Sequence, residues 1–416
     1  MAYGWNVLGV SDANDTGCTE NALDVFRNTK GRPMIILDSH LGYGAPHKQD
    51  TAAARGEPLG EEEIRLKAFP ELAAEIDQMQ RRELPAGWGR NLLVFRADPK
   101  GIAGRDISSK LLNVIAQNIP WFLGGSADPG ASNRTLLTYE AAGEFQADTP
   151  AGKNLYDGIR EHTMASIVNG LSLSKLRAFS TFFIFNDYAR PAIRLSAIME
   201  LPTLFLFTYD AMRDGEDGPT HQPFEQLASL RAVPGLVKLR PADANEVIEA
   251  YRYILQLRHE SVALMLSRQP LPTFDRTKYA QASGLARGAY VLGDAPGGNP
   301  EIILIASGCE VSLAVNAHET LLAQGIRSRV VSMPSWDIFD HQSQHYCNSV
   351  LPPAVKALVA IQQASTFGWE RFTGYSGRII GMKTFGASAP LEELQRKFRF
   401  EHEHVVAAAK ELLGRS

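Results

Sequence analysis

Gly215-Glu216-Asp217-Gly218-Pro219-Thr220-His221-Gln222-Pro223 is the stretch that decides how this chain is interpreted. It follows an apolar run at 204–207 that predicts a buried strand, and it precedes residues 224–230, whose pattern predicts an amphipathic helix. It therefore lies at the carboxyl end of a strand, where open α/β sheets bind ligands. Its glycines and prolines restrict a backbone that carries a carboxylate, Asp217, and an imidazole, His221. A rigid turn with a helix cap is the alternative interpretation, although the full nine residues are more specific than an Asp-Gly pair.

Strand and helix patterns alternate on both sides of this stretch, most regularly from about Gly101 onward. Such alternation indicates parallel sheets covered by helices, so we predict an α/β fold. The predicted strands are 33–37, 182–185, 204–207, 236–240, 262–266, 301–306, 329–332, 357–360 and 379–382, and the main predicted helices are 21–26, 107–115, 165–171, 246–257, 310–322 and 405–413. Four segments result: 1–65, a linker at 66–100, 101–285 and 286–416.

Composition narrows the classes of protein to which this chain can belong. Of its 416 residues, 44% are hydrophobic and 21% are charged, as in an ordinary globular protein. A net charge of -4, without clustered Lys and Arg, argues against nucleic acid or acidic membranes as partners. Cys18, Cys309 and Cys347 lie too far apart for a CxxC motif, which argues against a disulfide framework or a structural zinc site. The N-terminus does not read as a signal peptide and no apolar run reaches about 20 residues, so we expect a cytoplasmic protein.

Two further motifs carry candidate chemistry. Glu161, in Arg160-Glu161-His162, begins a largely apolar helical stretch. A carboxylate there is usually a partner of the helix dipole, but burial could also make it a general acid or base. The second motif, residues 180–191, places aromatic side chains before a polar Asn-Asp pair. Alternating aromatics in a strand most often belong to the core.

These motifs together resemble those of transketolases, thiamine-diphosphate enzymes. The resemblance rests on the nine-residue stretch, on Gly124-Gly125-Ser126-Ala127-Asp128, on residues 180–191 and on residues 330–336 and 385–390, so it covers nearly the whole chain. It implies a pyrimidine-binding domain at 101–285, a transketolase C-terminal domain at 286–416, and at 1–65 a remnant of the diphosphate-binding domain.

The resemblance also implies a role for each matching residue. Glu161 would contact N1′ of the aminopyrimidine, so that the cofactor forms the ylid that attacks the substrate. The cofactor-binding set would be Asp128, Glu161, Phe182, Phe185 and Tyr188. The substrate-binding set would be Arg105, Ser132, Asp217, His221 and Arg268, with Glu161 and His221 as the catalytic pair. The implied reaction is transfer of a two-carbon ketol unit between sugar phosphates.

The chain departs from the family where the metal should be held. The Gly-Asp-Gly run and later Asn that bind Mg²⁺ or Ca²⁺ in the family do not occur in the N-terminal segment, so we expect no metal ligand here. We therefore expect an N-terminally truncated form whose two-stranded remnant needs cover, from a tight homodimer or from a second chain that supplies the missing half. Arg55 and Tyr209 also stand where the family usually has histidines.

Three hypotheses follow. The first is a ketol transferase completed by a partner chain. The second is a catalytically inactive homologue that acts as a scaffold or regulator, which Arg55, Tyr209 and the missing metal ligands favour. The third is a different thiamine-dependent reaction, such as that of a ketoacid-decarboxylating component, which the retention of Asp217 and His221 disfavours.

Overall fold

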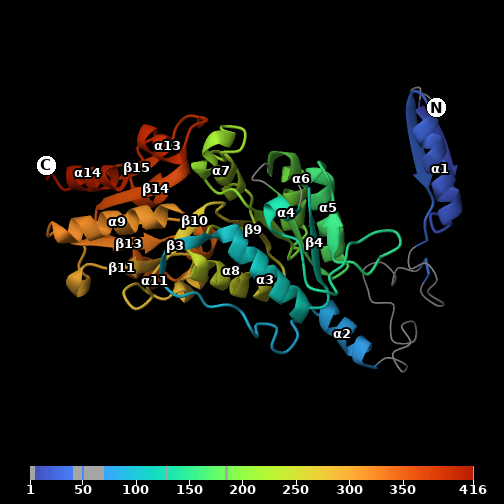
Figure 1. The fold of residues 1–416 in the computed structure, drawn as a ribbon, viewed down its shortest axis with the longest axis horizontal. Coiled ribbons are helices and arrows are strands. Elements are labelled where there is room, and N and C mark those ends of the chain that lie inside the picture. The colour runs from blue at the N-terminus through green and yellow to red at the C-terminus, as the bar shows by residue number, and fades with distance from the viewer. Residues whose placement is uncertain (1–4, 41–48, 51–69, 128–129, 183–185, 416) are drawn as a thin grey trace. The chain divides into compact units, whose positions relative to one another are not determined.

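The computed structural model describes residues 5–40, 49–50, 70–127, 130–182 and 186–415. It divides into two compact units, Met1–Glu83 and Leu84–Ser416, which are described separately. Figure 1 shows the fold and labels its elements. The division falls inside the segment predicted as a linker, and the helix α2 (Pro70–Gln80) also lies within that segment.

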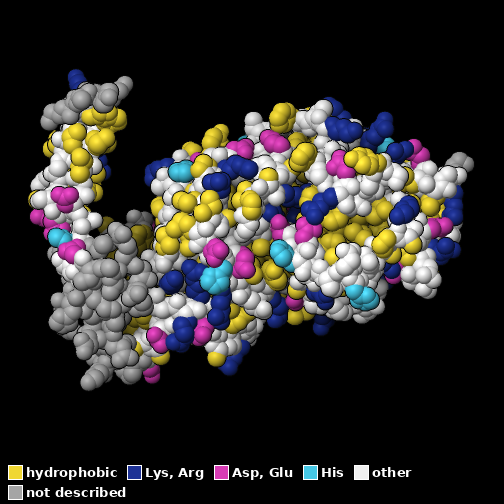
Figure 2. Space-filling model, turned by 180° about the vertical axis from the view of Figure 1, so that it is seen from behind, with side chains coloured by type: hydrophobic (Ala, Val, Ile, Leu, Met, Phe, Trp, Pro, Cys, Tyr) yellow, Lys and Arg dark blue, Asp and Glu magenta, His cyan; other side chains and the backbone are white. Residues whose placement is uncertain are grey.

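The N-terminal unit contains a two-stranded parallel sheet. Strands β1 (Trp5–Val10) and β2 (Arg32–Leu37) pair in register and are joined by helix α1 (Thr16–Asn28). Asp15 caps α1 by accepting a hydrogen bond from the Cys18 amide. A parallel sheet normally buries both faces. Here Met34 and Ile36, on one face of β2, are 38% and 52% exposed, and Figure 2 shows apolar side chains at the surface of this unit.

The larger unit holds a six-stranded sheet in the order β5-β4-β6-β7-β9-β8, all parallel. Because such strands are covered on both faces, they read as continuous apolar runs, and every residue of β7 is buried. The strands are β4 (Phe122–Ser126), β5 (Asn154–Tyr156), β6 (Arg177–Phe182), β7 (Leu204–Phe207), β8 (Leu236–Leu239) and β9 (Ser261–Met265).

Helices cover this sheet in two layers. Helices α5 (Glu161–Leu173), α6 (Asn186–Ile198) and α7 (Gln226–Arg231) connect strands that advance in one direction across the sheet. Helix α8 (Ala244–Gln256) connects β8 back to β9 in the opposite direction. Right-handed crossovers then place α8 on the opposite face, where it packs with α3 (Gly104–Asn118). A short helix, α4 (Gly130–Asn133), follows β4.

The strand predicted at 182–185 overlaps the described structure only at Phe182, the last residue of β6 (Arg177–Phe182). Residues 183–185 lie outside the described residues, and Asn186 begins α6. The earlier part of β6 was not predicted, and the structure pairs Phe179–Phe182 with Leu204–Phe207. An antiparallel ribbon of β3 (Asp98–Ala103) and β10 (Pro270–Thr273) was not predicted, since its partners are about 170 residues apart and carry prolines.

A second sheet of five strands, in the order β11-β13-β12-β14-β15, forms the C-terminal domain. Its strands are β11 (Tyr290–Gly293), β12 (Ile302–Ala306), β13 (Ser328–Ser332), β14 (Ala357–Ser365) and β15 (Arg378–Met382), of which only β11 is antiparallel. Helices α9 (Glu310–Ala323) and α14 (His402–Leu412) lie side by side against it. The remaining helices are α10 (Trp336–Asp340), α11 (Gln344–Val350), α12 (Glu370–Thr373) and α13 (Leu391–Lys397).

Short 3₁₀ turns complete the larger unit at η2 (Met212–Asp217), η3 (Ala282–Arg287) and η4 (Pro296–Gly298). Across the described residues, no helix combines the length and the apolar character that a membrane crossing requires.

Candidate functional site

Polar side chains join three strands where they end at the carboxyl edge of the six-stranded sheet. Asn133 donates to the Ser126 hydroxyl at 2.9 Å and accepts from the Thr208 hydroxyl at 3.1 Å. The Ser126 hydroxyl in turn donates to the carbonyl of Thr181 at 3.2 Å. Because all of these groups are buried, each hydrogen bond has a high cost if broken, and together they fix the ends of β4, β6 and β7 relative to one another.

Arg105 and Ser132 meet at this edge. The Arg105 guanidinium donates to the Ser132 carbonyl at 3.3 Å. The backbone amide of Arg105 donates to the Ser267 carbonyl at 3.1 Å. The Gly104 amide donates to the Ser267 hydroxyl, so the start of α3 is bound to the chain that leaves β9. Arg268 follows directly. Two arginines predicted to bind a phosphate are therefore anchored to one short segment.

The nine-residue stretch brings its two chemical groups to the same place. Asp217 ends η2 and accepts a hydrogen bond from Arg268 at 2.7 Å. The Arg268 guanidinium lies over the Tyr209 ring at 4.9 Å, and the Tyr209 and His221 rings are 6.4 Å apart. The His221 Nδ1 contacts the Thr220 hydroxyl at 2.9 Å, which orients the ring. Tyr209, Asp217, His221 and Arg268 thus form one cluster, called the loop cluster below.

The predicted cofactor-binding residues are only partly described. Glu161 is half-buried at the first position of α5, at the carboxyl end of β5. Tyr188 lies on α6 and is 67% exposed. Asp128 and Phe185 lie outside the described residues. Phe182 ends β6, and only its backbone is described.

Sequence reasoning missed Asp157, a buried carboxyl directly after β5 and four residues before Glu161. Burial raises the pKa of Asp157 from 3.8 to about 6, and the Arg160 guanidinium opposes that rise. Carboxyls with such a shift are enriched at functional sites. No strand was predicted at 154–156, so the position of Asp157 at a strand end could not be recognised from the sequence.

The residues at this edge fit one end of the cofactor that the sequence resemblance implies. Glu161 supplies a half-buried carboxylate, and the Thr181 Oγ1 at the end of β6 is buried without a hydrogen-bond partner among the described residues. A polar ring with a donor and an acceptor, such as an aminopyrimidine, can use such groups. The described part of the chain has no group of three or more His, Cys, Asp or Glu that could hold a metal ion.

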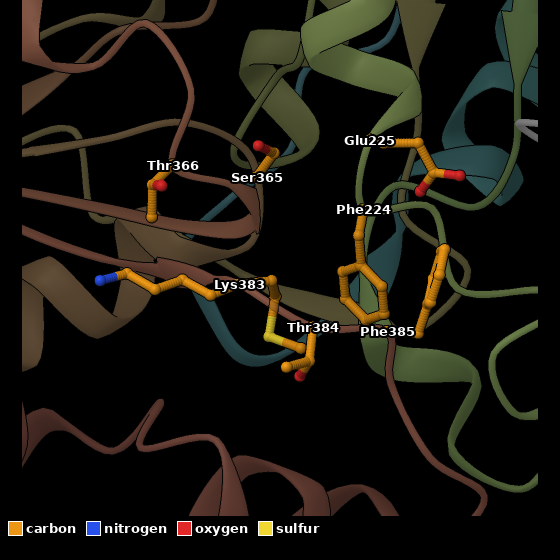
Figure 3. Close-up of a pocket in the computed structure, with 8 residues that line it drawn as sticks. Phe224, Glu225, Ser365, Thr366, Lys383, Thr384 and Phe385 are labelled. Carbon is orange, nitrogen blue, oxygen red and sulfur yellow. The ribbon is translucent and has the colours of Figure 1, made fainter.

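A cavity of about 500 Å³ lies between the residues that follow the nine-residue stretch and the carboxyl ends of β14 and β15. Figure 3 shows the rings of Phe224 and Phe385 next to each other in its wall, with Lys383 and Thr366 further along. Its described wall contains none of the site residues predicted from the sequence. The periodic patterns at 224–230 and 379–382 gave no sign of it, because it forms only where two domains meet.

Three domain families match successive parts of the chain. "Transketolase, thiamine diphosphate binding domain" matches residues 1–77, "Transketolase, pyrimidine binding domain" matches 100–273, and "Transketolase-like TK C-terminal domain" matches 288–401. The gap between the last two matches, from 273 to 288, falls between the six-stranded sheet, whose last strand ends at Met265, and the five-stranded sheet, whose first strand begins at Tyr290.

Relatives of known identity match along the whole chain. A transketolase of Geobacillus stearothermophilus is 40% identical over 100% of this chain and 69% of its own length. The crystal structure of a Pichia stipitis transketolase in complex with sedoheptulose-7-phosphate has a TM-score of 0.79 and 32% identity, over 100% of this chain and 68% of that one. A structure described as "Split gene transketolase, inactive beta4 tetramer" has a TM-score of 0.60 and covers 76% of this chain and 99% of that one; at 23% identity it shows a shared fold alone. The chain belongs to the transketolase family.

Proposed function

We propose that this chain is the pyrimidine-binding and substrate-binding half of a ketol-transferring enzyme, and that a partner chain supplies the diphosphate-binding and metal-binding half. The observation that carries the proposal is the loop cluster, in which Asp217, His221 and Arg268 converge at the same sheet edge as Glu161. Because the Gly-Asp-Gly run that binds the metal in the family does not occur in the N-terminal segment, we assign the metal ligands to the partner.

The chain's own residues divide the work by chemistry. Thiamine diphosphate, when bound, supplies the nucleophilic carbon that attacks a ketose carbonyl. Glu161 would hydrogen-bond N1′ of the pyrimidine ring, and Phe182, Phe185 and Tyr188 would cover the apolar faces of that ring. Glu161 is half-buried at the first position of α5, and a carboxyl group there can serve as a general acid or base.

The loop cluster and the start of α3 would bind the sugar phosphate. A guanidinium has five N–H donors, so Arg268 can bind Asp217 and a phosphate together, and Arg105 adds a second cation. Asp217 would accept a hydrogen bond from a substrate hydroxyl, and His221 would move a proton at the hydroxyl of the reacting carbon. Ser132 would also contact the substrate, and Asp128, which lies outside the described residues, would contact the cofactor. The Pichia stipitis transketolase, a relative whose crystal structure is a complex with sedoheptulose-7-phosphate, supports sugar phosphates as the substrate class.

Association also belongs to the proposal. The exposed apolar face of β1 and β2 would be covered by the partner chain or by a second copy of this chain. The split-gene transketolase that shares this fold is described as an inactive β4 tetramer, which supports testing the chain both alone and with a partner.

The test is calorimetric and then enzymatic. The purified chain is titrated with thiamine diphosphate and Mg²⁺, alone and after mixing with a diphosphate-binding chain from a transketolase relative. Ketol transfer from xylulose 5-phosphate to ribose 5-phosphate is then measured. We expect transfer only in the mixture, and we expect Glu161→Gln to lower its rate by about 10² or more, the size of a lost acid–base contribution. Glu393→Gln, an exposed change on α13, is the matched control.

A second function has one observation in its favour. The inactive scaffold or regulator is supported by Tyr209, a bulky ring between Arg268 and His221 at a place where the family resemblance implies a histidine. If Glu161→Gln leaves both the cofactor affinity and the transfer rate of the mixture unchanged, this chain contributes no chemistry and the scaffold function replaces the proposal.

A further inference from the structure

The C-terminal domain contacts the nine-residue stretch at its end. The Gln222 side-chain amide donates to the Ala387 carbonyl at 3.1 Å and to the Gly215 carbonyl at 3.4 Å, and the Ala389 amide also donates to Gly215 at 3.3 Å. Gln222 is 3% exposed, so these bonds are shielded from water. They join residues 215–222 to the segment between β15 and α13, which is called the 385–390 segment below.

Two glycines make this approach possible. A Cβ at Gly218, whose φ is +75°, would collide with the Ser388 hydroxyl, and a Cβ at Gly386 would collide with the Gln222 side chain. Glycine is therefore favoured at Gly218 by its left-handed backbone and at Gly386 by the lack of space beside Gln222 and Phe224. The nine-residue stretch and the 385–390 segment were recognised separately in the sequence, and the structure packs them against each other.

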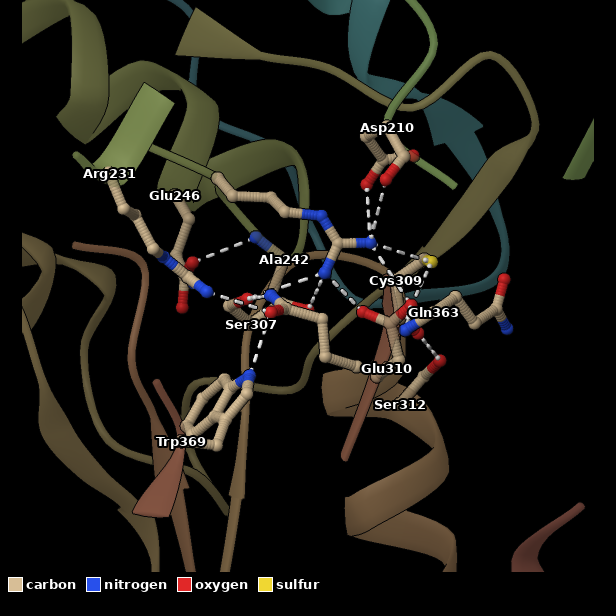
Figure 4. A network of polar contacts seen from close by, with 12 residues as sticks. Asp210, Arg231, Ala242, Glu246, Ser307, Cys309, Glu310, Ser312, Gln363 and Trp369 are labelled. Atoms are coloured by element: carbon tan, nitrogen blue, oxygen red, sulfur yellow. Dashed lines mark hydrogen bonds and ion pairs between the residues drawn. The ribbon is translucent and has the colours of Figure 1, made fainter. Parts of the chain in front are cut away.

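The C-terminal domain is also linked to the beginning of the same loop. The link is Arg240, which directly follows β8 of the six-stranded sheet. Its guanidinium pairs with both carboxylate oxygens of Glu310 and lies 3.1 Å from the Asp210 carboxylate (Figure 4). It also donates to the Ser307 carbonyl at 2.7 Å. Burial opposes the charge on Arg240, but the carboxylates of Glu310 and Asp210 outweigh that effect and raise its pKa. Asp210 directly follows Tyr209 of the loop cluster.

The position of Arg240 in the C-terminal sheet is informative. Strand order is β13-β12-β14-β15, so it reverses between β12 and β14, and Ser307 and Glu310 follow β12. The carboxyl ends of strands at such a reversal are where open α/β domains bind ligands. Here the side chain of a neighbouring domain fills that place. A buried ion pair often adds little net stability, so the pairing of Arg240 with Glu310 suggests a role other than stabilisation.

We propose that the C-terminal domain is the frame that positions the substrate loop, with Arg240 and Glu310 holding its start at Asp210 and Gln222 holding its end. These three are positioning residues, which act on Asp217 and His221 through the backbone of residues 210–222. The inference rests on the proposed function insofar as the loop binds a sugar phosphate. It gives a role to the domain for which the sequence indicated no chemistry.

The first test uses Gln222→Leu, which keeps a branched side chain one atom shorter and removes both donated bonds. Amide hydrogen exchange is measured over residues 208–222 of the full chain, together with its affinity for xylulose 5-phosphate. We expect exchange in the loop to rise about tenfold, equivalent to ~1.4 kcal/mol, while the β12 and β14 amides keep their protection. The sugar-phosphate Kd should rise by a similar factor. Gln344→Leu, an exposed change on α11, should alter neither quantity.

A second set of variants separates positioning from stability. Glu310→Gln leaves a buried cation poorly paired and could unfold the domain. The triple change Asp210→Asn, Arg240→Met and Glu310→Leu removes every charge of the network, so the thermal midpoint should recover while loop exchange stays fast. If the loop keeps wild-type exchange in both the triple variant and Gln222→Leu, the frame is overturned. If the wild-type chain does not bind xylulose 5-phosphate, the proposed function fails, and the exchange data still decide the frame.

Discussion

The Arg268 guanidinium donates to the Asp217 carboxylate at 2.7 Å, although 51 residues separate them in the chain. The two side chains are 32% and 41% exposed, so the pair contributes little to stability. Its consequence is geometric: it ties the end of β9 to the nine-residue stretch and places a cation beside Tyr209 and His221. Binding, rather than folding, is where this pair should be measurable.

Arg268→Ala should weaken the affinity for xylulose 5-phosphate by about 10–100-fold, because a charge-assisted hydrogen-bond donor to the phosphate is lost. The free energy of unfolding should change by less than about 1 kcal/mol. Titration calorimetry and urea denaturation measure the two quantities. Arg252→Ala, which breaks a comparable surface pair with Glu249, should change neither. An unchanged affinity in Arg268→Ala would remove this residue from the binding site.

Asp157 should make stability depend on pH. Burial raises the pKa of Asp157 to about 6 in the folded chain, above the ordinary 3.8. Between these values the folded state binds more protons than the unfolded state, so this group's contribution falls as pH rises from about 4 to about 6, by ~2–3 kcal/mol in all. Asp157→Asn removes the effect. Relative to wild type, the variant should therefore gain stability between pH 4.5 and pH 7 in urea denaturation, and parallel profiles for the two proteins would contradict the shift.

Asp243 should contribute to stability twice. As the N-cap of α8 it accepts from the Glu246 amide at 2.8 Å, and it also pairs with Arg276 at 2.7 Å. Asp243→Asn can keep the cap but loses the buried pair, whereas Asp243→Ala loses both. We expect Asp243→Ala to cost about 3–5 kcal/mol and Asp243→Asn to cost less. Asp15→Ala, which removes only the exposed cap of α1, should cost about 1 kcal/mol in the same urea denaturation experiment.

Ile36→Glu should weaken association of the chain with a second copy or with its partner. Ile36 and Met34 share one face of β2 and stay exposed, so a charge there opposes burial of that face. Sedimentation velocity should show a rise of about tenfold or more in the dissociation constant, equivalent to ~1.4 kcal/mol. Val94→Glu, at another exposed apolar residue, is the control. Equal association of the two variants would place the contact surface elsewhere.

Elements with strong local signals could be predicted from the sequence. Strand β7 was predicted at its observed residues, and β12, β13 and α9 to within a residue or two, because continuous apolar runs and helical periodicity are local properties. The strand predicted at 182–185 is tested only at Phe182, which ends β6, because residues 183–185 lie outside the described residues. Strand β11 was not predicted, since its four residues at a sheet edge carry little pattern.

For the site, the types of residue could be predicted but their neighbours could not. That Asp217 and His221 follow a buried strand is legible in the sequence, because strand, turn and helix are written consecutively. The pairing of Asp217 with Arg268, the burial of Asp157 and the contact of Gln222 with Ala387 depend on segments far apart in the chain. Local sequence determined the elements and the family of this protein; packing between two sheets decided which charges meet and which domain holds the loop, because only burial and long-range contact set those energies.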